Sequence, residues 1–349
     1  MRYCDMYFDD IKRVAKVLPG ISELRGKSIF ITGASGLIGS SVCDLLLFLN
    51  REKELNMKLY FAGRNRERLT QRFLYFVEGQ DYCFVEYDSL KEAAIDFSCE
   101  YYIHCASNAA PAQFAVSPVE TLLMNVVGVR NILDAAARSG GRVLYVSSSE
   151  VYGINEKGEP YTEEDYGYVD ILNPRAAYPS GKRAAETLCA AYLQEYGVDS
   201  VVVRPGHIYG PQCISSDNRA ASEFARKAAS HEDIVMKSKG TQLRSYCYSL
   251  DCASAILTVL LAGNKGEAYN ISNKDSIVTI SDLARECAAA GGVELLYEEA
   301  TDAEKKSFNL MPTSALNAKK LENLGWKALF DITEGIEHTV YLLFSGCAS

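Results

Sequence analysis

Short apolar runs alternate with longer amphipathic stretches through the first two thirds of the chain. The runs have the length of strands, whereas the stretches between them have the length and spacing of helices. Strands are predicted at Ser28–Thr32, Leu59–Ala62, Cys83–Glu86, Tyr101–Cys105, Val143–Ser147 and Ser200–Arg204. Helices are predicted at Ile38–Leu49, Glu67–Phe76, Pro118–Ser139 and Tyr178–Tyr196. This alternation indicates an α/β fold with a doubly wound parallel sheet that is buried on both faces.

A glycine-rich loop, residues 33–39, lies between the first predicted strand and the first predicted helix. Glycines permit a tight turn and the close approach of a pyrophosphate, and a helix N-terminus attracts that negative charge. In this strand–loop–helix context the loop predicts a dinucleotide site on a Rossmann sheet. The candidate contacts are Gly33, Ser35, Gly36, Leu37, Ile38 and Gly39.

The end of the second predicted strand leaves the kind of dinucleotide open. Sites that prefer NAD usually carry an acidic residue there, which binds the ribose 2′-hydroxyl. This chain has Ala62-Gly63-Arg64-Asn65, and Arg64 either suits the 2′-phosphate of NADP or is a solvated loop arginine. We therefore expect NAD, with NADP as the alternative.

Tyr178 and Lys182 are four residues apart in a predicted helix, so they share one helix face. A phenol has a pKa of about 10, and a neighbouring ammonium lowers such a pKa by about 1–3 units. The strand at Val143–Ser147 leads into Ser148-Ser149-Glu150, which places polar side chains at a strand end, where open α/β sheets bind ligands. A tyrosinate base beside a dinucleotide predicts hydride removal from a carbon that bears a hydroxyl.

The chain resembles the extended short-chain dehydrogenase/reductases of the nucleotide-sugar epimerase/dehydratase/decarboxylase group, from about Lys27 to the C-terminus. The segments that carry the resemblance are the glycine loop, His104-Cys105-Ala106-Ser107, Ser117-Pro118 leading to Asn125, Ser148 to Gly153, Asn173 to Tyr178, and Arg204 to Pro211.

The resemblance implies a role for individual residues. Tyr178 would be the base, Lys182 would lower the pKa of Tyr178 and hold the ribose, Ser148 would hydrogen-bond the reacting oxygen, and Glu150 would act at C5 of the sugar. Further cofactor contacts would be Asp88, at the adenine, with Ala106, Ser107, Ser147 and Pro205. Substrate contacts would be Ser149, His207, Arg219 and Arg244. His207 is a departure, because relatives commonly have Asn there, near the diphosphate.

The reaction that follows oxidation at C4 stays open among three possibilities. In similar 4,6-dehydratases the tract reads Thr-Asp-Glu, but here Ser149 stands at the Asp position, and a serine is a poor general acid. In 4-epimerases the Glu is typically absent, whereas UDP-glucuronate decarboxylases have a hydroxyl residue followed by Ser-Glu, as in this chain. We expect decarboxylation, with 4-epimerisation and then 4,6-dehydration as alternatives. A catalytically silent dinucleotide-binding sensor is a further alternative, but such proteins usually lose the Tyr or the Lys.

The flanking segments complete the expected organisation. Ile11, Val14, Ala15 and Leu18 have helical spacing, which predicts a helix packed outside the main fold. Further helices are predicted at Ser222–Ser230, Leu250–Leu261, Ser281–Ala290 and Ala315–Leu324. The expected parts are a helical extension (1–27), a dinucleotide-binding Rossmann domain (28–204, with 245–263 returning to it) and a smaller α/β nucleotide-sugar-binding lobe (205–244 and 264–349).

Composition narrows the class further. A net charge of −9 argues against nucleic-acid binding, and no apolar run is long enough to span a bilayer. The 11 cysteines are scattered without CxxC pairs, and the 4 histidines form no cluster, so we expect neither disulfides nor a metal site. These features, and a start without a signal-peptide pattern, predict a cytoplasmic protein. The resemblance also implies a homodimer that pairs the helices Pro118–Ser139 and Tyr178–Tyr196.

Overall fold

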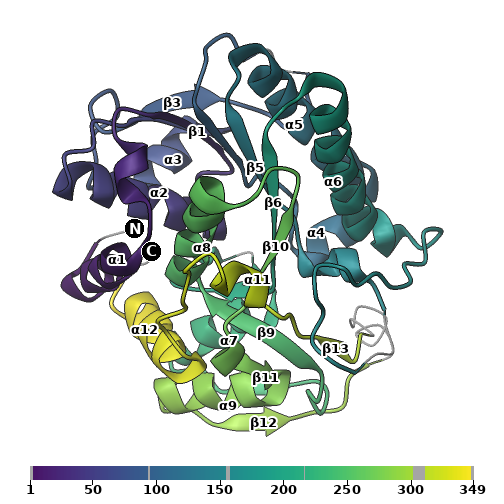
Figure 1. Ribbon diagram of the computed structural model, residues 1–349. Coiled ribbons are helices and arrows are strands. Elements are labelled where there is room, and N and C mark those ends of the chain that lie inside the picture. The colour runs from purple at the N-terminus through teal and green to yellow at the C-terminus, as the bar shows by residue number, and fades with distance from the viewer. Residues whose placement is uncertain (1–2, 93–94, 155–157, 216, 302–310, 347–349) are drawn as a thin grey trace.

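A seven-stranded parallel sheet forms the centre of the computed structural model, which describes residues 3–92, 95–154, 158–215, 217–301 and 311–346 (Figure 1). The strand order is β10-β6-β5-β4-β1-β2-β3. Their bounds are β1 Ser28–Thr32, β2 Lys58–Gly63, β3 Cys83–Glu86, β4 Tyr101–His104, β5 Arg142–Val146, β6 Ser200–Pro205 and β10 Ala268–Ile271. The predicted doubly wound Rossmann sheet is confirmed, since the order reverses at β1 and the paired strands all run parallel.

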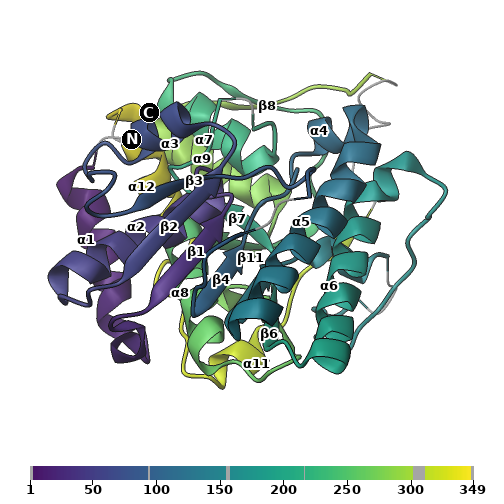
Figure 2. The same cartoon turned by 90° about the horizontal axis from the view of Figure 1, so that it is seen from above.

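Helices cover both faces of this sheet, and alternate residues of β1 show why. Ile29 and Ile31 pack in the core with α2 (Leu37–Glu52) and α8 (Ser249–Ala262), whereas Phe30 points into the other layer. That layer holds α5 (Pro118–Ser139) and α6 (Ala177–Tyr196), which lie side by side in Figure 2. Short elements complete this part of the chain: η1 Ile21–Leu24, α3 Arg66–Arg72, α4 Pro111–Val116, η2 Ser149–Tyr152 and η3 Pro174–Ala176.

The N-terminal helix α1 (Asp5–Val17) forms as predicted, but the expectation that it packs outside the main fold is wrong. Its side chains Tyr7 and Val14 are fully buried in the core against α2 and α8. The carboxylate of Asp44 in α2 accepts hydrogen bonds from the hydroxyls of Tyr3 (2.5 Å) and Tyr7 (2.7 Å). It also forms an ion pair with Arg72. Apolar spacing reveals a buried helix face but does not say what that face meets.

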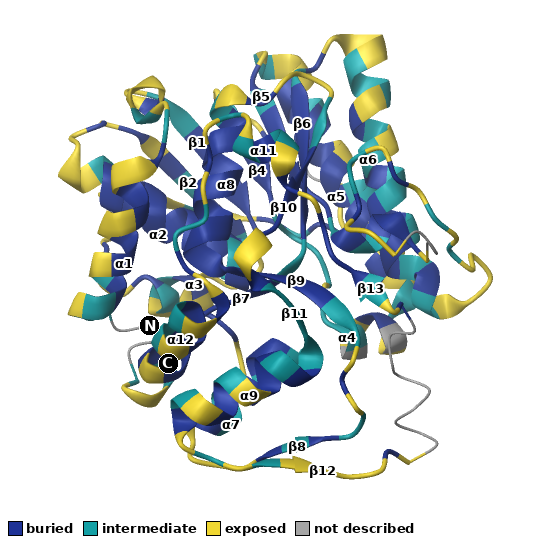
Figure 3. Ribbon diagram, turned by 60° about the horizontal axis from the view of Figure 1, so that its bottom comes forward, coloured by how far each residue is buried: buried dark blue, intermediate teal, exposed yellow. Residues whose placement is uncertain are grey.

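The smaller lobe lies beyond the carboxyl ends of the large sheet and occupies the lower part of Figure 3. Its helices are α7 (Ala220–Ala229), α9 (Ile280–Gly291) and α12 (Ile332–Phe344), with η4 (Lys274–Ser276). One small sheet joins β7 (His207–Tyr209), β9 (Leu243–Tyr248), β11 (Ile277–Thr279) and β13 (Thr313–Ser314), and another pairs β8 (Ile234–Met236) with β12 (Leu295–Tyr297).

Two elements of the C-terminal third differ from the sequence prediction. The helix predicted at residues 315–324 is only α11 (Lys319–Glu322), because the backbone before it is extended: Ala315 accepts from the Tyr161 N–H, and the Leu316 N–H donates to Ser245 Oγ. Strand β10 was not predicted, and it pairs with β6 in the large sheet although it lies in the stretch 264–349 that was expected in the smaller lobe.

Candidate active site

The glycine loop has the shape that a dinucleotide requires. Gly33 has φ +68°, and a Cβ on Gly39 would lie 2.2 Å from the Gly33 carbonyl oxygen, so no larger residue fits there. The cap residue of α2, Gly36, has no side chain to occupy the first N–H groups of the helix. These N–H groups and the positive end of the helix dipole therefore remain for a pyrophosphate, and the residues present fit the dinucleotide.

The ends of the neighbouring strands are tied to this loop. Thr32 Oγ1 lies 2.8 Å from His104 Nδ1 and accepts a hydrogen bond from the Ala106 N–H (3.3 Å). Ser107 donates to Asn125 Oδ1 at 3.0 Å, which links the end of β4 to helix α5. Ala106 and Ser107 thus lie at the same edge of the sheet as the glycine loop, as the sequence predicts.

Arg64 and Asp88 follow β2 and β3 at that edge. Arg64 is exposed, and Asp88 is partly buried, with Oδ1 accepting from the Leu90 N–H at 3.1 Å. Both positions agree with a surface that faces the adenosine half of a dinucleotide.

Tyr178 and Lys182 lie in the first turns of α6 and are both almost fully buried, with exposed fractions of 6% and 2%. Lys182 Nζ donates to the Val146 carbonyl at 2.8 Å, which anchors the ammonium to the end of β5. Nζ lies 5.8 Å from the centroid of the Tyr178 ring. The predicted shared helix face is therefore present.

Burial dominates the electrostatics of this pair. Burial raises the pKa of Tyr178 to about 12, and the Ser148 hydrogen bond and the Arg219 charge offset only part of this rise. Burial also lowers the pKa of Lys182 to about 7, because desolvation disfavours the charged form of either group. The charge of Lys182 is not among the causes that shift the pKa of Tyr178, so the expectation that Lys182 lowers this pKa stays a prediction.

Ser148, Ser149 and Glu150 lie where β5 ends and the short helix η2 begins. Ser148 Oγ accepts from the Glu150 N–H at 3.2 Å and also hydrogen-bonds Tyr178. Burial raises the pKa of Glu150, while the charges of Arg175 and Arg244 lower it by less. Ser149 is buried in η2. Ser147 is also buried, and its hydroxyl has no hydrogen-bond partner in the part of the chain that the structure describes. Pro205 ends the adjacent strand β6.

The smaller lobe contributes His207, Arg219 and Arg244 to the same region. Arg219 forms a bidentate pair with Asp217, at 2.9 Å from Nε to Oδ1 and 2.6 Å from Nη2 to Oδ2. Arg244 is buried and donates to the carbonyls of Leu243 (2.9 Å) and Met311 (3.0 Å).

His207 is held as a neutral ring. Burial lowers the pKa of His207 to about 3, and the charges of Arg244 and Arg219 contribute to this shift. Its Nδ1 is buried and has no partner among the described residues. The residues predicted from the two lobes are therefore brought close enough to influence each other's ionisation.

Sequence reasoning missed two side chains that contact these groups. The Phe114 ring from α4 stacks on Tyr178 with centroids 5.3 Å apart and planes 14° apart. Arg175 lies over Phe114 at 5.4 Å and places Nη2 3.8 Å from Glu150 Oε1. Arg175 belongs to the segment Asn173–Tyr178, which carries the resemblance, but Phe114 lies in a region of loose similarity that gave no signal.

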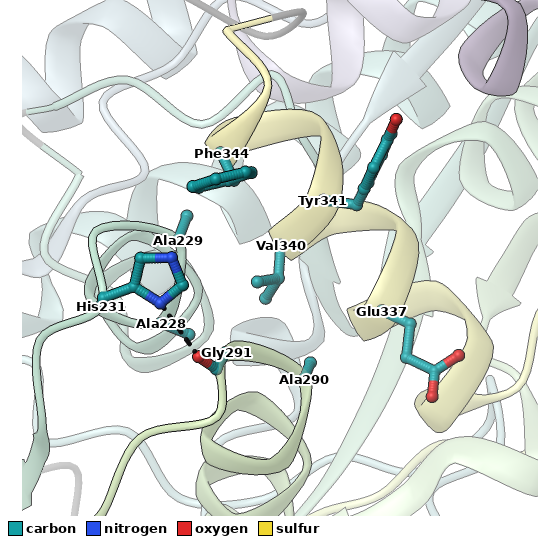
Figure 4. Close-up of a pocket in the computed structure, with 9 residues that line it drawn as sticks. All are labelled: Ala228, Ala229, His231, Ala290, Gly291, Glu337, Val340, Tyr341 and Phe344. Carbon is teal, nitrogen blue, oxygen red and sulfur yellow. Dashed lines mark hydrogen bonds between the residues drawn. The ribbon is translucent and has the colours of Figure 1, made fainter.

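A separate pocket of about 150 Å³ lies among α7, α9 and α12 (Figure 4). Its wall is mostly small and apolar, and the His231 ring in it contacts the Gly291 carbonyl through Nδ1 at 3.2 Å. None of the predicted site residues lines it, so it is not part of the candidate active site.

The described residues contain no group of three or more His, Cys, Asp or Glu side chains placed to hold a metal ion. No described helix is both long and apolar enough to cross a membrane.

A Rossmann sheet with a glycine loop, and a buried Tyr–Lys pair at the strand ends, define an extended short-chain dehydrogenase/reductase. The family model "NAD dependent epimerase/dehydratase family" matches residues 29–272, so the chain belongs to that family. This membership supports NAD as the cofactor.

Curated relatives narrow the resemblance. The chain is 31% identical over 324 residues to UDP-glucuronic acid decarboxylase 1 of Xenopus tropicalis, covering 92% of this chain and 73% of the relative. It is 29% identical to UDP-glucuronic acid decarboxylase 6 of Arabidopsis thaliana, covering 88% and 86%. The predicted resemblance to UDP-glucuronate decarboxylases is confirmed.

Solved structures agree on the fold. A UDP-glucose 4-epimerase of Thermotoga maritima superposes with a TM-score of 0.77 at 22% identity, covering 91% of this chain and 99% of that one. A dTDP-glucose 4,6-dehydratase of Bacillus anthracis, in complex with NAD, gives a TM-score of 0.74 at 20% identity, covering 90% and 96%. At such identities these likenesses show the shared fold and leave the reaction to the site residues.

Proposed function

We propose that this chain is an NAD-dependent enzyme that oxidises C4 of a nucleotide sugar transiently and decarboxylates UDP-glucuronate. One observation carries the proposal: Glu150, in a hydroxyl-Ser-Glu tract, converges with Tyr178 at the end of β5. The curated relatives named as UDP-glucuronic acid decarboxylases support the choice of substrate.

The residues have distinct tasks in this scheme. Tyr178 takes the proton of the 4-hydroxyl, and Ser148, which hydrogen-bonds Tyr178, also holds the reacting oxygen. The glycine loop and Lys182 would hold NAD⁺, which would supply a reversible hydride acceptor for C4 and a positive charge that favours the phenolate. Because Lys182 is fixed to the Val146 carbonyl, its role is to hold the ribose and to supply charge in its protonated form.

Loss of CO₂ follows from the 4-keto group. A C5 carboxylate is then a β-keto acid, so the C5–carboxylate bond breaks, its electron pair enters the enolate, and protonation at C5 completes the step. Glu150 lies beside this carbon in the proposed geometry, and burial raises the pKa of its carboxyl group, which favours its protonated form. Protonation at C5 and hydride return at C4 give a neutral pentose.

The two alternative reactions, 4,6-dehydration and 4-epimerisation, have weaker support. A 4,6-dehydratase needs an acid for the departing hydroxyl, and the chain has Ser149 in that position. A 4-epimerase shares the fold, and the Thermotoga structure is one, but that likeness carries no residue-level argument for this chain.

Finer properties of the enzyme are also part of the proposal. NAD is preferred, with NADP as the alternative through the exposed Arg64. Asp88 contacts the adenine, and His207, Arg219 and Arg244 face the diphosphate, with Ser149 at the sugar.

The enzyme is a cytoplasmic homodimer in this proposal. The exposed Val119, Leu122 and Leu123 on α5 support the dimer, because an apolar helix face of this kind is typical of an interface. The described cysteines form no disulfide with one another, which supports a reducing compartment.

Mass spectrometry of the products tests the proposed reaction. The purified protein is incubated with NAD⁺ and, separately, with UDP-glucuronate, UDP-glucose, dTDP-glucose, GDP-mannose and CDP-glucose. Decarboxylation of UDP-glucuronate removes about 44 mass units, dehydration of a hexose removes about 18, and epimerisation leaves the mass unchanged with altered retention. Loss of water from a neutral hexose, with UDP-glucuronate left intact, would refute the proposal.

A further inference from the structure

The cations near Tyr178 differ in what they already bind. Arg219 is paired with Asp217, Arg244 donates to two backbone carbonyls, and Lys182 donates to the Val146 carbonyl. Arg175 stands apart from these three. Its guanidinium makes an ion pair with Glu150 at 3.8 Å and donates no hydrogen bond to any residue in the described part of the chain. Its donors therefore remain for a ligand.

Arg175 is nevertheless held firmly in place. Its backbone N–H donates to Asn173 Oδ1 at 3.0 Å, in the turn that leads directly into α6. Its guanidinium lies over the Phe114 ring at 5.4 Å, and that ring stacks on Tyr178. Guanidinium, phenyl and phenol rings thus form one stack, which fixes the position of the cation relative to the base. The Arg175 side chain is 32% exposed, so a ligand can reach it.

We propose that Arg175 binds the C5 carboxylate of the sugar and so selects acidic nucleotide sugars over neutral ones, an inference that rests on the proposed function. A uronate brings a carboxylate next to Glu150, and a carboxylate that leaves water is stabilised only when a cation or hydrogen-bond donors lie beside it. Arg175 is already beside Glu150, and a planar guanidinium matches a carboxylate through two parallel hydrogen bonds. A neutral hexose has a hydroxymethyl group at this position and gains no such pair.

Binding measurements distinguish the contribution of the sugar carboxylate to affinity from that of the rest of the ligand. Calorimetry compares UDP-glucuronate with UDP-glucose and UDP-xylose, which lack the carboxylate, on the protein loaded with NADH, which cannot accept the C4 hydride and so leaves the ligands unreacted. Arg175→Met removes a charged hydrogen-bond pair, so it should lower the affinity for UDP-glucuronate about tenfold to a hundredfold. The affinities for the two neutral ligands should stay within about twofold of wild type. Arg175→Lys keeps the charge without the fork and falls between. Arg285→Met removes an exposed arginine paired with Asp282 on α9, and it should change none of the three affinities.

Three outcomes decide the matter. Equal weakening of all three ligands by both Arg175 variants would overturn the carboxylate role and leave only an effect on the Phe114–Tyr178 stack, which Phe114→Leu would then reproduce. If the wild type prefers UDP-glucuronate in binding and loses that preference in the variants, the inference holds even when no CO₂ is released, and the proposed function alone fails. A wild type that binds neutral sugars as tightly as UDP-glucuronate would overturn both. Arg175→Lys serves as the test if Arg175→Met does not fold.

Discussion

Replacing the buried Lys182 with methionine changes how the stability of the protein depends on pH. The ammonium is 2% exposed, and burial lowers its pKa from 10.5 to about 7. Between these two values the unfolded chain binds a proton at this lysine and the folded protein does not. Stability of the wild type therefore rises with pH in this window, by up to about 1.4 kcal/mol per pH unit from this group.

The magnitude follows from the same shift. Lowering the pKa of Lys182 by roughly 3.5 corresponds to a loss of at most roughly 5 kcal/mol in the free energy of unfolding. This loss is complete below pH 7 and vanishes above about pH 10.5. Lys182→Met abolishes this titration, while losing the hydrogen bond to the Val146 carbonyl, whose donor is neutral in this window, costs about 0.5–1.5 kcal/mol at every pH tested. The free energy of unfolding of the variant minus that of the wild type should thus decrease steadily from pH 7 to pH 10.

Urea denaturation of the cofactor-free protein at pH 7, 8, 9 and 10 measures this difference. Lys319→Met, at a lysine that is 71% exposed, is the matched control and should give a difference that does not vary with pH. Parallel stability curves for the wild type and Lys182→Met would show that the buried amine titrates normally and would refute the reasoning.

Three further perturbations have defined outcomes. Tyr178→Phe should retain NAD binding but lose about a hundredfold to ten-thousandfold in turnover because the base is gone; full activity in steady-state assays would refute the base assignment. Gly39→Ala should abolish NAD binding in calorimetry, since its Cβ would lie 2.2 Å from the Gly33 oxygen, and tight binding would contradict the loop geometry. The pKa of His338 is raised by Asp10, so this pair stabilises the fold at low pH and the contribution is lost as pH rises through the raised value. His338→Asn should remove that loss, which in the wild type begins as pH rises above about 6.5 in thermal melts, whereas an unchanged pH profile would show that the pair contributes nothing.

The strands of the large sheet were predictable because their signal is local. Short, largely apolar runs mark Ser28–Thr32, which lies between Lys27 and Gly33, and Cys83–Glu86, and the structure places both strands at the predicted residues. Strand β10 is only four residues long and contains the buried Asn270. The Asn270 side chain accepts a hydrogen bond from the Tyr152 hydroxyl and donates to the carbonyls of Tyr161 and Asn317. That pairing depends on distant residues, so no local pattern indicates it.

The positions of Tyr178, Lys182 and the glycine loop were predictable, but the pKa values of the two side chains were not. Spacing alone placed Tyr178 and Lys182 on one helix face, and the glycine loop identified the end of the sheet where they lie. The degree of burial was not visible in the sequence, and burial decides the pKa of both groups. The stack of Arg175 on Phe114 joins α4 to η3, a tertiary contact that spacing cannot reveal.

The contacts between α1 and Asp44 extend the folding unit beyond the residues that the family model matches. The family match begins at residue 29, yet Tyr3 and Tyr7 supply two of the donors that satisfy a fully buried carboxylate in α2, the helix that follows the glycine loop. A fragment that begins at residue 29 would leave Asp44 with Arg72 in a cavity open to water, and it would also free Gln212 from Tyr7. Recombinant production of this enzyme should therefore keep the first residues, because they complete the packing around α2, the helix that follows the glycine loop.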